Sequence, residues 1–412
     1  MSQAPRVNRS FSLLLAFALA GLAPPALAND LPPAVPTSIV EPAPPIAVPP
    51  PPPASPGAAE AMKLLEADIG TRFGLRVQNP TQPNKLNDLG MDGQVQVFLS
   101  GQAGRTLRWQ ADFVGNLGAV KQNVASAAAA DQSSVSGSAG VLDLIARFEF
   151  HDAFKLWFGR MIVPIDRSGL STEWSIAPWL FPGRFVTGAA PLGARQGPYS
   201  RNDGATLWGQ LGGGTFKYYL GAYDLSDSTK SPLYSGRLSL SLLNPEPGYG
   251  NASTYYGSKD ILALGLGFQH QTDGSIPIAS ATTGATTGDA VADFNEFNID
   301  LLFEKNLGAA GVIDLEGAFY KIPGGHEPAT TTCFALASYL LPIEVGVGRF
   351  QPLFRLQQAY LRGSDDVNTL ADAQLGYIID GLKSRLSLGY QYSKVAGQAG
   401  NAILLGLQLQ TR

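Results

Sequence analysis

The chain contains one cysteine and three histidines in 412 residues. With only Cys333, it has neither an intrachain disulfide nor a cysteine-rich metal site. His151, His270 and His326 are scattered without the spacing of metal ligands. The sequence therefore predicts no metal ion and no other cofactor.

Charged residues are also scarce, at 15% of the chain, against about 25% in ordinary soluble proteins. After Ala28 no apolar run approaches the roughly 20 residues of a transmembrane helix, although 45% of the residues are apolar. Any segment that crosses a membrane must therefore be a strand.

The N-terminus has the features of an export signal. Arg6 and Arg9 precede an apolar stretch at 11–22 that is too short to span a bilayer, and Ala26-Leu27-Ala28 has the small residues of a cleavage site. We predict that residues 1–28 are a signal peptide. Its removal takes two of the 29 basic residues and leaves 27 against 33 acidic ones, which disfavours a nucleic-acid partner.

Residues 29–57 form a proline-rich stretch in which prolines 49–53 are unbroken. Proline lacks a backbone N–H and favours polyproline II, so this stretch predicts a semi-rigid linker. The following segment, 58–69, begins with helix-favouring residues and predicts a short helix. The remainder, 70–412, is expected to be one domain.

That domain shows an alternation of apolar and polar residues in segments of about ten. From Leu142 to Phe150 the even positions are apolar, and three of the four odd positions between them are charged. A transmembrane β-barrel requires this pattern, with apolar residues toward lipid and polar ones toward a wet lumen. We therefore predict an all-β, antiparallel barrel of about 16 strands. The expected strands are 70–78, 93–101, 105–115, 140–151, 154–162, 201–210, 215–225, 233–242, 260–270, 292–304, 311–321, 330–340, 349–361, 368–379, 383–394 and 401–411.

Loop lengths agree with a barrel of the bacterial outer membrane, where outer loops are long and periplasmic turns short. If the first strand runs outward, the gaps at 116–139, 163–200 and 271–291 are outer loops. One gap breaks the pattern, because residues 243–259 would be a long inner turn. Either the register slips there or this turn is unusual.

Strand parity predicts which side chains face lipid and which face the lumen. Lipid-facing examples are Phe297, Ile299, Leu301 and Phe303, and the acids between them would line the pore. Acids cluster on the tenth and eleventh strands and bases on the thirteenth and fifteenth. This distribution predicts a transverse electric field across the pore, mutual ion pairing, or both. The candidate pore-lining residues are Arg108, Asp112, Arg147, Glu149, Arg160, Arg167, Arg184, Arg195, Arg201, Glu296, Asp300, Asp314, Glu316, Arg355 and Arg385.

The gap at 163–200, the third outer loop, is far longer than ordinary loops. It carries Trp174, Trp179, Phe181 and Phe185, whose burial would require packing against another surface. With its flanks the loop holds five arginines against three acids. We predict that it folds into the barrel as a constriction with a mild anion preference; the alternative is a loop packed over the rim or on a neighbouring subunit.

The segment Phe154 to Pro164, FKLWFGRMIVP, resembles the strand that enters the third loop in the phosphate-selective porin O and P family. The resemblance implies a trimeric, sixteen-stranded outer-membrane barrel with an inward third loop. Two features depart from that family. Residues 271–291 contain no Lys or Arg where phosphate-selective members carry a lysine cluster, and the C-terminus lacks the usual aromatic residue. Phosphate specificity is therefore not expected.

These features predict an outer-membrane channel for passive diffusion of small hydrophilic solutes. Two alternatives remain open, and an enzyme is not expected. A plugged structural or adhesive barrel would attach to the cell wall through the proline-rich linker. A soluble exported β-sandwich would be extracted from cells without detergent. A barrel hydrolase would need a nucleophile beside a histidine, but neither Ser200 nor Ser384 has a fitting histidine on a neighbouring expected strand.

Overall fold

A computed structural model describes most of the second of two compact units, Ala58–Arg412. The described residues are 65–79, 88–122, 132–172, 174–179, 200–226, 231–275, 291–395 and 397–411. The predicted signal peptide, the proline-rich linker and residues 58–64 of the predicted helix lie outside them.

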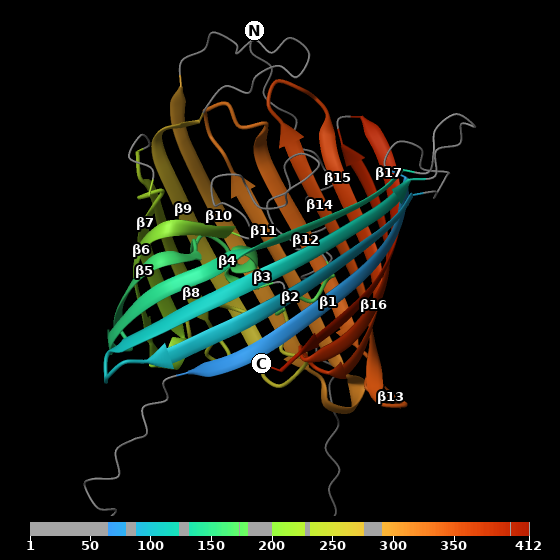
Figure 1. Ribbon diagram of the computed structural model, residues 1–412, viewed down its shortest axis with the longest axis horizontal. Coiled ribbons are helices and arrows are strands. Elements are labelled where there is room, and N and C mark those ends of the chain that lie inside the picture. Colours follow the sequence, from blue (N-terminus) through green and yellow to red (C-terminus); the bar gives the residue numbers. More distant parts are fainter. Residues whose placement is uncertain are drawn as a thin grey trace, which may run out of the picture. The chain divides into compact units, whose positions relative to one another are not determined.

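The described strands form one closed antiparallel barrel. Each long strand pairs with its neighbours along the chain, and β1 pairs with β17, from Gly70 opposite Gln410 to Asn79 opposite Asn401. Figure 1 shows the strands inclined across a continuous wall. The two-residue β13 only extends the hairpin that precedes β14. Sixteen long strands remain, so the predicted fold class and strand order are confirmed.

Residues 116–122 and 132–139 of the outer loop predicted at 116–139 belong to strands, so that prediction is wrong there. The strands otherwise begin and end within five residues of the predicted positions. They are β1 (Glu66–Asn79), β2 (Asp88–Gln102), β3 (Leu107–Gln122), β4 (Gln132–His151), β5 (Phe154–Ile162), β6 (Arg201–Leu211), β7 (Phe216–Tyr223), β8 (Leu233–Ser241), β9 (Ile261–Ser275), β10 (Ala292–Asn306), β11 (Val312–Lys321), β12 (Ala329–Leu340), β13 (Glu344–Val345), β14 (Gly348–Leu361), β15 (Val367–Asp380), β16 (Ser384–Val395) and β17 (Gln398–Gln410). In the part of the chain that the structure describes, helical turns are limited to α2 (Arg167–Leu170), η3 (Gly212–Gly214) and η4 (Gly308–Ala310). No helix in the described ranges is long and apolar enough to cross a membrane.

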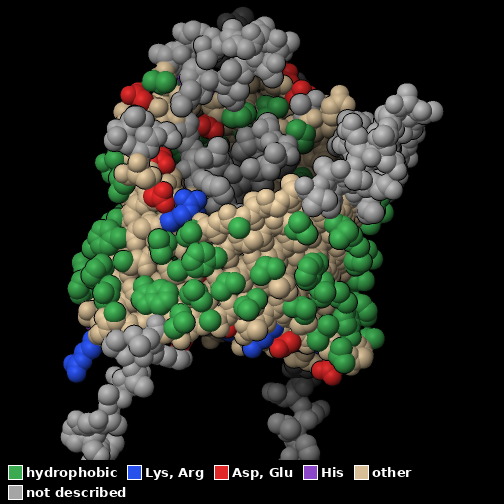
Figure 2. All heavy atoms as spheres, in the orientation of Figure 1, with side chains coloured by type: hydrophobic (Ala, Val, Ile, Leu, Met, Phe, Trp, Pro, Cys, Tyr) green, Lys and Arg blue, Asp and Glu red, His purple; other side chains and the backbone are tan. Residues whose placement is uncertain are grey.

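Side chains alternate across the wall as predicted. On β10, Phe297 and Ile299 are each 49% exposed, whereas Glu296 and Asp300 are buried. Leu386, Leu388 and Tyr390 repeat the outward pattern on β16. Figure 2 shows apolar side chains spread over the outer wall, with charged ones near its upper and lower borders. The outer surface is therefore apolar while the interior carries the charges, which is the reverse of a soluble protein.

Two further local predictions are wrong. The helix predicted over 58–69 fails at residues 66–69, because β1 begins at Glu66 and pairs with β2 from that residue. The even-position rule on β4 fails at Leu142. A β-bulge there leaves Leu142 buried, while Val141 points outward opposite Phe113, because one extra residue reverses the strand's parity.

The connections differ in length between the two ends of the barrel. At the short-turn end the links 103–106, 152–153, 212–215 and 381–383 are brief. The exception is the long link between Ser241 and Ile261, which we call the inner turn (residues 242–260). The register of β8 against β9 is regular. Of the two explanations offered above, the unusual turn is therefore the right one, and no register slip occurs.

Candidate functional site in the barrel interior

Residues 163–172 of the third loop pack against side chains that point inward from β8 and β10. The carboxylate of Asp166 caps α2 by accepting from the backbone N–H of Gly169 at 2.7 Å. The carbonyl oxygen of Ile165 accepts from Arg237 at 3.0 Å, and the backbone N–H of Arg167 donates to Asp300 at 3.1 Å. All the residues from 163 to 171 are buried.

The next part of the loop, residues 174–179, contacts a different sector of the wall. The indole N–H of Trp174 donates to Gln96 on β2. Arg72 on β1 donates to the carbonyl oxygen of Trp179 at 2.7 Å, and its guanidinium lies 4.2 Å from that indole ring. Arg385 on β16 donates to the carbonyl oxygen of Ala177 at 2.8 Å. The loop thus contacts β8 and β10 at one end and β1, β2 and β16 at the other.

Glycines in the wall make room for the two indole rings. A Cβ on Gly406 of β17 would lie 2.5 Å from the ring of Trp179, and one on Gly70 of β1 would lie 2.8 Å from the ring of Trp174. Real side chains do not approach so closely. Each ring therefore occupies space that only glycine leaves free.

Replacing Gly406 by Ala is expected to displace Trp179 and to destabilise the fold by about 1–3 kcal/mol, the usual cost of overpacking. Gly140 on β4 is the control, because a Cβ there would meet nothing within 4 Å. Guanidinium unfolding and acrylamide quenching of indole fluorescence would measure the two effects. Equal behaviour of Gly406→Ala and Gly140→Ala would mean that the ring does not lie against this glycine.

The inner turn meets the third loop through a buried ion pair. Nη1 of Arg167 lies 2.9 Å from Oε1 of Glu246, and the two side chains are 2% and 1% exposed. The hydroxyl of Tyr255 donates to the same carboxylate at 2.5 Å. Such a pair, removed from water, holds only when its remaining polar atoms are also bonded.

Carboxylates on β10 and β11 hold the inner turn against the wall. Glu304 accepts from the hydroxyl of Thr254 at 2.8 Å and from the backbone N–H groups of Tyr255 and Gly257 at 2.7 Å each. Glu316 accepts from the hydroxyl of Ser253. These acids therefore bind the turn instead of facing open water.

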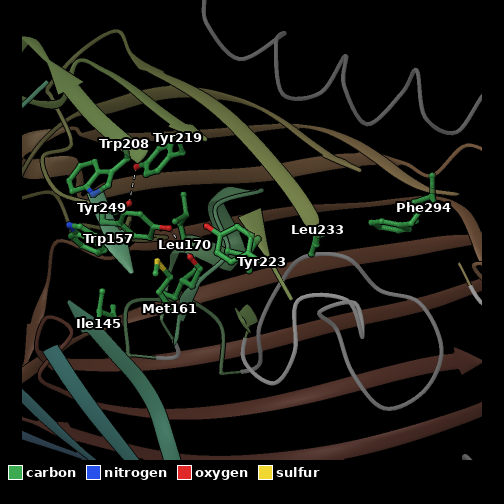
Figure 3. Close-up of a cluster of buried hydrophobic side chains, with 13 residues drawn as sticks. Ile145, Trp157, Met161, Leu170, Trp208, Tyr219, Tyr223, Leu233, Tyr249 and Phe294 are labelled. Carbon is green, nitrogen blue, oxygen red and sulfur yellow. Dashed lines mark hydrogen bonds between the residues drawn. The ribbon is translucent and has the colours of Figure 1, made fainter. Parts of the chain in front are cut away.

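An aromatic cluster packs the other side of the inner turn. The ring of Tyr249 stacks on Trp157 at 4.5 Å and meets Tyr219 edge-on at 5.2 Å. Figure 3 shows Tyr249 among Trp157, Trp208 and Tyr219. The hydroxyl of Tyr219 donates to the carbonyl oxygen of Tyr249 at 2.8 Å. These contacts come from β5, β6 and β7 and fix the turn by apolar burial as well as by charge.

The charges of the ion pair are mutually stabilised. Burial raises the pKa of Glu246, but the guanidinium of Arg167 and the hydroxyl of Tyr255 outweigh it, so the net pKa lies below its usual value. Burial lowers the pKa of Arg167, yet the carboxylate of Glu246 outweighs this effect and the net pKa is raised. Both groups are therefore ionised at neutral pH.

A lowered carboxyl pKa predicts a pH-dependent contribution to stability. The contribution of Glu246 is complete above the ordinary pKa of 4.5 and is lost as pH falls through the lower value in the folded protein. The stability difference between the wild type and Glu246→Gln should therefore shrink as pH is lowered from 7 to 3. Guanidinium midpoints across that range would measure it. A constant difference would mean that Glu246 does not titrate as the partner of Arg167.

The predicted pore-lining residues fall into three groups. Arg167, Asp300 and Glu316 meet around the third loop and the inner turn, joined by Arg237 and Glu246. Arg184 and Arg195 lie outside the described residues. The others lie on strands: Arg147 beside Glu149 at 2.7 Å, Arg108 beside Glu149 at 3.5 Å, Arg201 beside Asp143 at 3.1 Å, Arg160 beside Asp203 at 3.3 Å, Arg355 beside Asp372, Asp314 beside Ser338, Arg385 beside Gln408, with Asp112 beside Gln110 and Glu296 buried.

Sequence reasoning missed Arg237, Glu246, Lys217 and Asp372. Arg237 had a signal, since it shares the inward parity of β8 with Ser235, Ser239 and Ser241. Lys217 donates to Asn251 of the inner turn at 2.7 Å. Arg237 pairs with Asp300, and Arg355 pairs with Asp372, so each of these arginines is neutralised by a nearby carboxylate. The transverse field therefore stays a prediction, whereas local ion pairing is present.

A cavity borders the third loop on the side of β14, β15 and β16. It is lined by Ala177, Gln351, Gln374, Arg385 and Ser387, among others. No group of three or more His, Cys, Asp or Glu residues in the described ranges could hold a metal ion. The polar groups that line this cavity are amides, a hydroxyl and a guanidinium, beside Leu353 and Ile378.

Solved structures share this architecture. OprB of Pseudomonas putida superposes with a TM-score of 0.56 at 12% identity, covering 84% of this chain and 94% of that one. OmpF of Salmonella typhi, solved with daunomycin, gives 0.54 at 9%, covering 84% and 97%. Both are outer-membrane porins. The chain has a porin fold.

The porin fold extends to a third structure, the trimer form of OmpT of Vibrio cholerae, with a TM-score of 0.50 at 15% identity over 84% of this chain and 98% of that one. No family model and no curated protein matches the sequence. At these identities the similarity establishes the porin fold, and the resemblance to the phosphate-selective family remains an expectation.

Proposed function

We propose that the protein is a porin of the bacterial outer membrane that lets small hydrophilic solutes diffuse passively. The observation that carries this proposal is the inversion of polarity across a closed barrel, apolar outside and charged inside. An apolar outer wall matches lipid, and a polar, charged interior is typical of a barrel that encloses an aqueous path. The short-turn end would then face the periplasm, after export directed by residues 1–28.

The third loop, in this proposal, folds into the barrel and narrows the pore. Its contacts with inward side chains of β1, β8 and β10 support that path. A homotrimer is also proposed, supported by the trimer form of OmpT of Vibrio cholerae and by the family resemblance. Neutral sugars of increasing size, tested by swelling of liposomes that contain the refolded protein, would measure passage. No swelling with even the smallest solute would contradict the proposal.

A mild anion preference is proposed from the loop arginines. Arg167 is unsuitable for testing it, because its charge is neutralised by Glu246. We expect Arg184→Ala/Arg195→Ala to lower the ratio of anion to cation permeability, measured as a reversal potential under a salt gradient. Arg362→Ala is the control, since Arg362 bonds backbone oxygens of the link before β12. An unchanged reversal potential in the double variant would remove the loop from the selectivity of the pore.

A plugged structural barrel is the second candidate. It is favoured by one observation, namely that the third loop and the inner turn bond to each other and to many sectors of the wall. The two candidates differ in conductance, because a fully plugged barrel would pass no ions.

A further inference from the structure

The inner turn is far longer than a hairpin connection requires. Nineteen residues separate β8 from β9, whereas β6 and β7 are joined at the same end by four, residues 212–215. Two strands that are neighbours and antiparallel need only a few residues to connect them. The extra length therefore has to be explained by what the turn contacts.

Its contacts lie on the inward side of the wall and span several strands. Lys217 on β7 donates to Asn251 at 2.7 Å, and Glu304 on β10 and Glu316 on β11 accept from Thr254 and Ser253. These three wall residues are all buried. The turn thus extends from β7 to β11 inside the barrel.

The turn is also bonded to the third loop at several points. The backbone N–H of Asn251 donates to the carbonyl oxygen of Leu170 at 3.2 Å, and that of Ser253 donates to the carbonyl oxygen of Ser175 at 2.8 Å. Arg167 adds its ion pair with Glu246, and its guanidinium also donates to the carbonyl oxygen of Ala252 at 3.2 Å. A segment from one end of the barrel therefore meets a segment from the other end inside it.

We propose that the inner turn is a second constriction element, which closes the sector of the lumen between β7 and β11 and sets the upper size of the solutes that pass. The proposal rests on the proposed porin function. In it, solutes are confined to the part of the lumen that the turn leaves free. The third loop supplies one face of the constriction, and the turn holds that loop in place.

Shortening the turn tests the proposal. Replacing residues 243–259 by the Gly-Gly-Gly-Thr that joins β6 to β7 should raise single-channel conductance by about two-fold or more, and should admit larger sugars in liposome swelling, because pore width controls both. The matched control puts the same four residues in place of 342–346. These residues lie in the link between β12 and β14, at the same end of the barrel, where Ile343 is 68% exposed. That control should leave conductance unchanged. Equal conductance and an equal size limit in the shortened variant would overturn the proposal.

A thiol probe provides a reading that does not depend on transport. Ser241 is buried and its hydroxyl lies 3.4 Å from Glu246. In a Cys333→Ala background, the thiol introduced by Ser241→Cys should react with a charged, water-soluble methanethiosulfonate at least about ten times faster once the turn is shortened. Equal reaction rates with the long and the short turn would show that the turn does not cover this part of the lumen.

The two readings separate the two proposals. If the proteins with the long and the short turn conduct alike, and the introduced thiol is equally reactive in both, the constriction is refuted and the porin function still stands. If neither protein conducts but the introduced thiol becomes reactive when the turn is shortened, passive transport is refuted and the turn remains a plug of the lumen. If the shortened protein loses the heat-modifiable migration of a folded barrel, Ser253→Ala/Thr254→Val replaces it. That variant removes two hydroxyl contacts of the turn. Its conductance and thiol reactivity then test the proposal in the same way.

Discussion

Replacing Glu246 by Gln is expected to lower the free energy of unfolding by about 3–5 kcal/mol, because it leaves the guanidinium of Arg167 buried without its counter-charge. Both side chains are almost fully buried, so water cannot take over the lost interaction. Guanidinium titration of the refolded protein in detergent, followed by indole fluorescence, would measure the change.

The double variant Arg167→Met/Glu246→Gln should recover part of that loss, since removing both charges removes the uncompensated one. The pair between Arg160 and Asp203 is the control. It is half-exposed, at 28% and 41%, and Asp203→Asn should cost about 0–1 kcal/mol. If Glu246→Gln and Asp203→Asn have equal, small effects, the ion pair does not join the loop to the turn.

Replacing Ile299 by Arg is expected to destabilise the barrel by about 2–4 kcal/mol in a bilayer, the cost of placing a charge at the midplane on the lipid side. Ile299 lies in the middle of β10, between Ala292 and Asn306, and points outward. Val291 lies just before the same strand and is equally exposed, so Val291→Arg should cost about 0–1 kcal/mol near the interface.

Unfolding of the two variants in phospholipid vesicles would measure this difference. In a soluble protein both positions would be exposed to water, and neither arginine would matter. Equal stabilities of Ile299→Arg and Val291→Arg would therefore mean that the apolar face of β10 does not meet lipid.

The strands could be predicted because their signal is local. Alternation with a period of two depends on only a few residues, and it located all sixteen long strands and the outward residues of β10 and β16. The prediction failed where one residue interrupts the period, at the bulge of Leu142. It also failed at residues 66–69, where helix propensity was overridden by pairing with β2.

The interior could be predicted only in part, because its pairs are remote in sequence. Asp300 was identified from its parity, but its partner Arg237 lies 63 residues away on another strand. Glu246 lies in the one long inner turn, which was noticed as an exception to the length pattern. Nothing in the local sequence indicates that this turn enters the barrel, since the contact with Arg167 joins residues 79 apart.

Single-channel recording of the refolded protein in a planar lipid bilayer tests the central claim most directly, that this barrel spans a membrane around an open aqueous path. The account predicts discrete, stable conductance steps in simple salt, with a reversal potential that favours anions when a gradient is imposed. A protein that is inserted and migrates as a folded, heat-modifiable barrel, yet shows no steps, would contradict it.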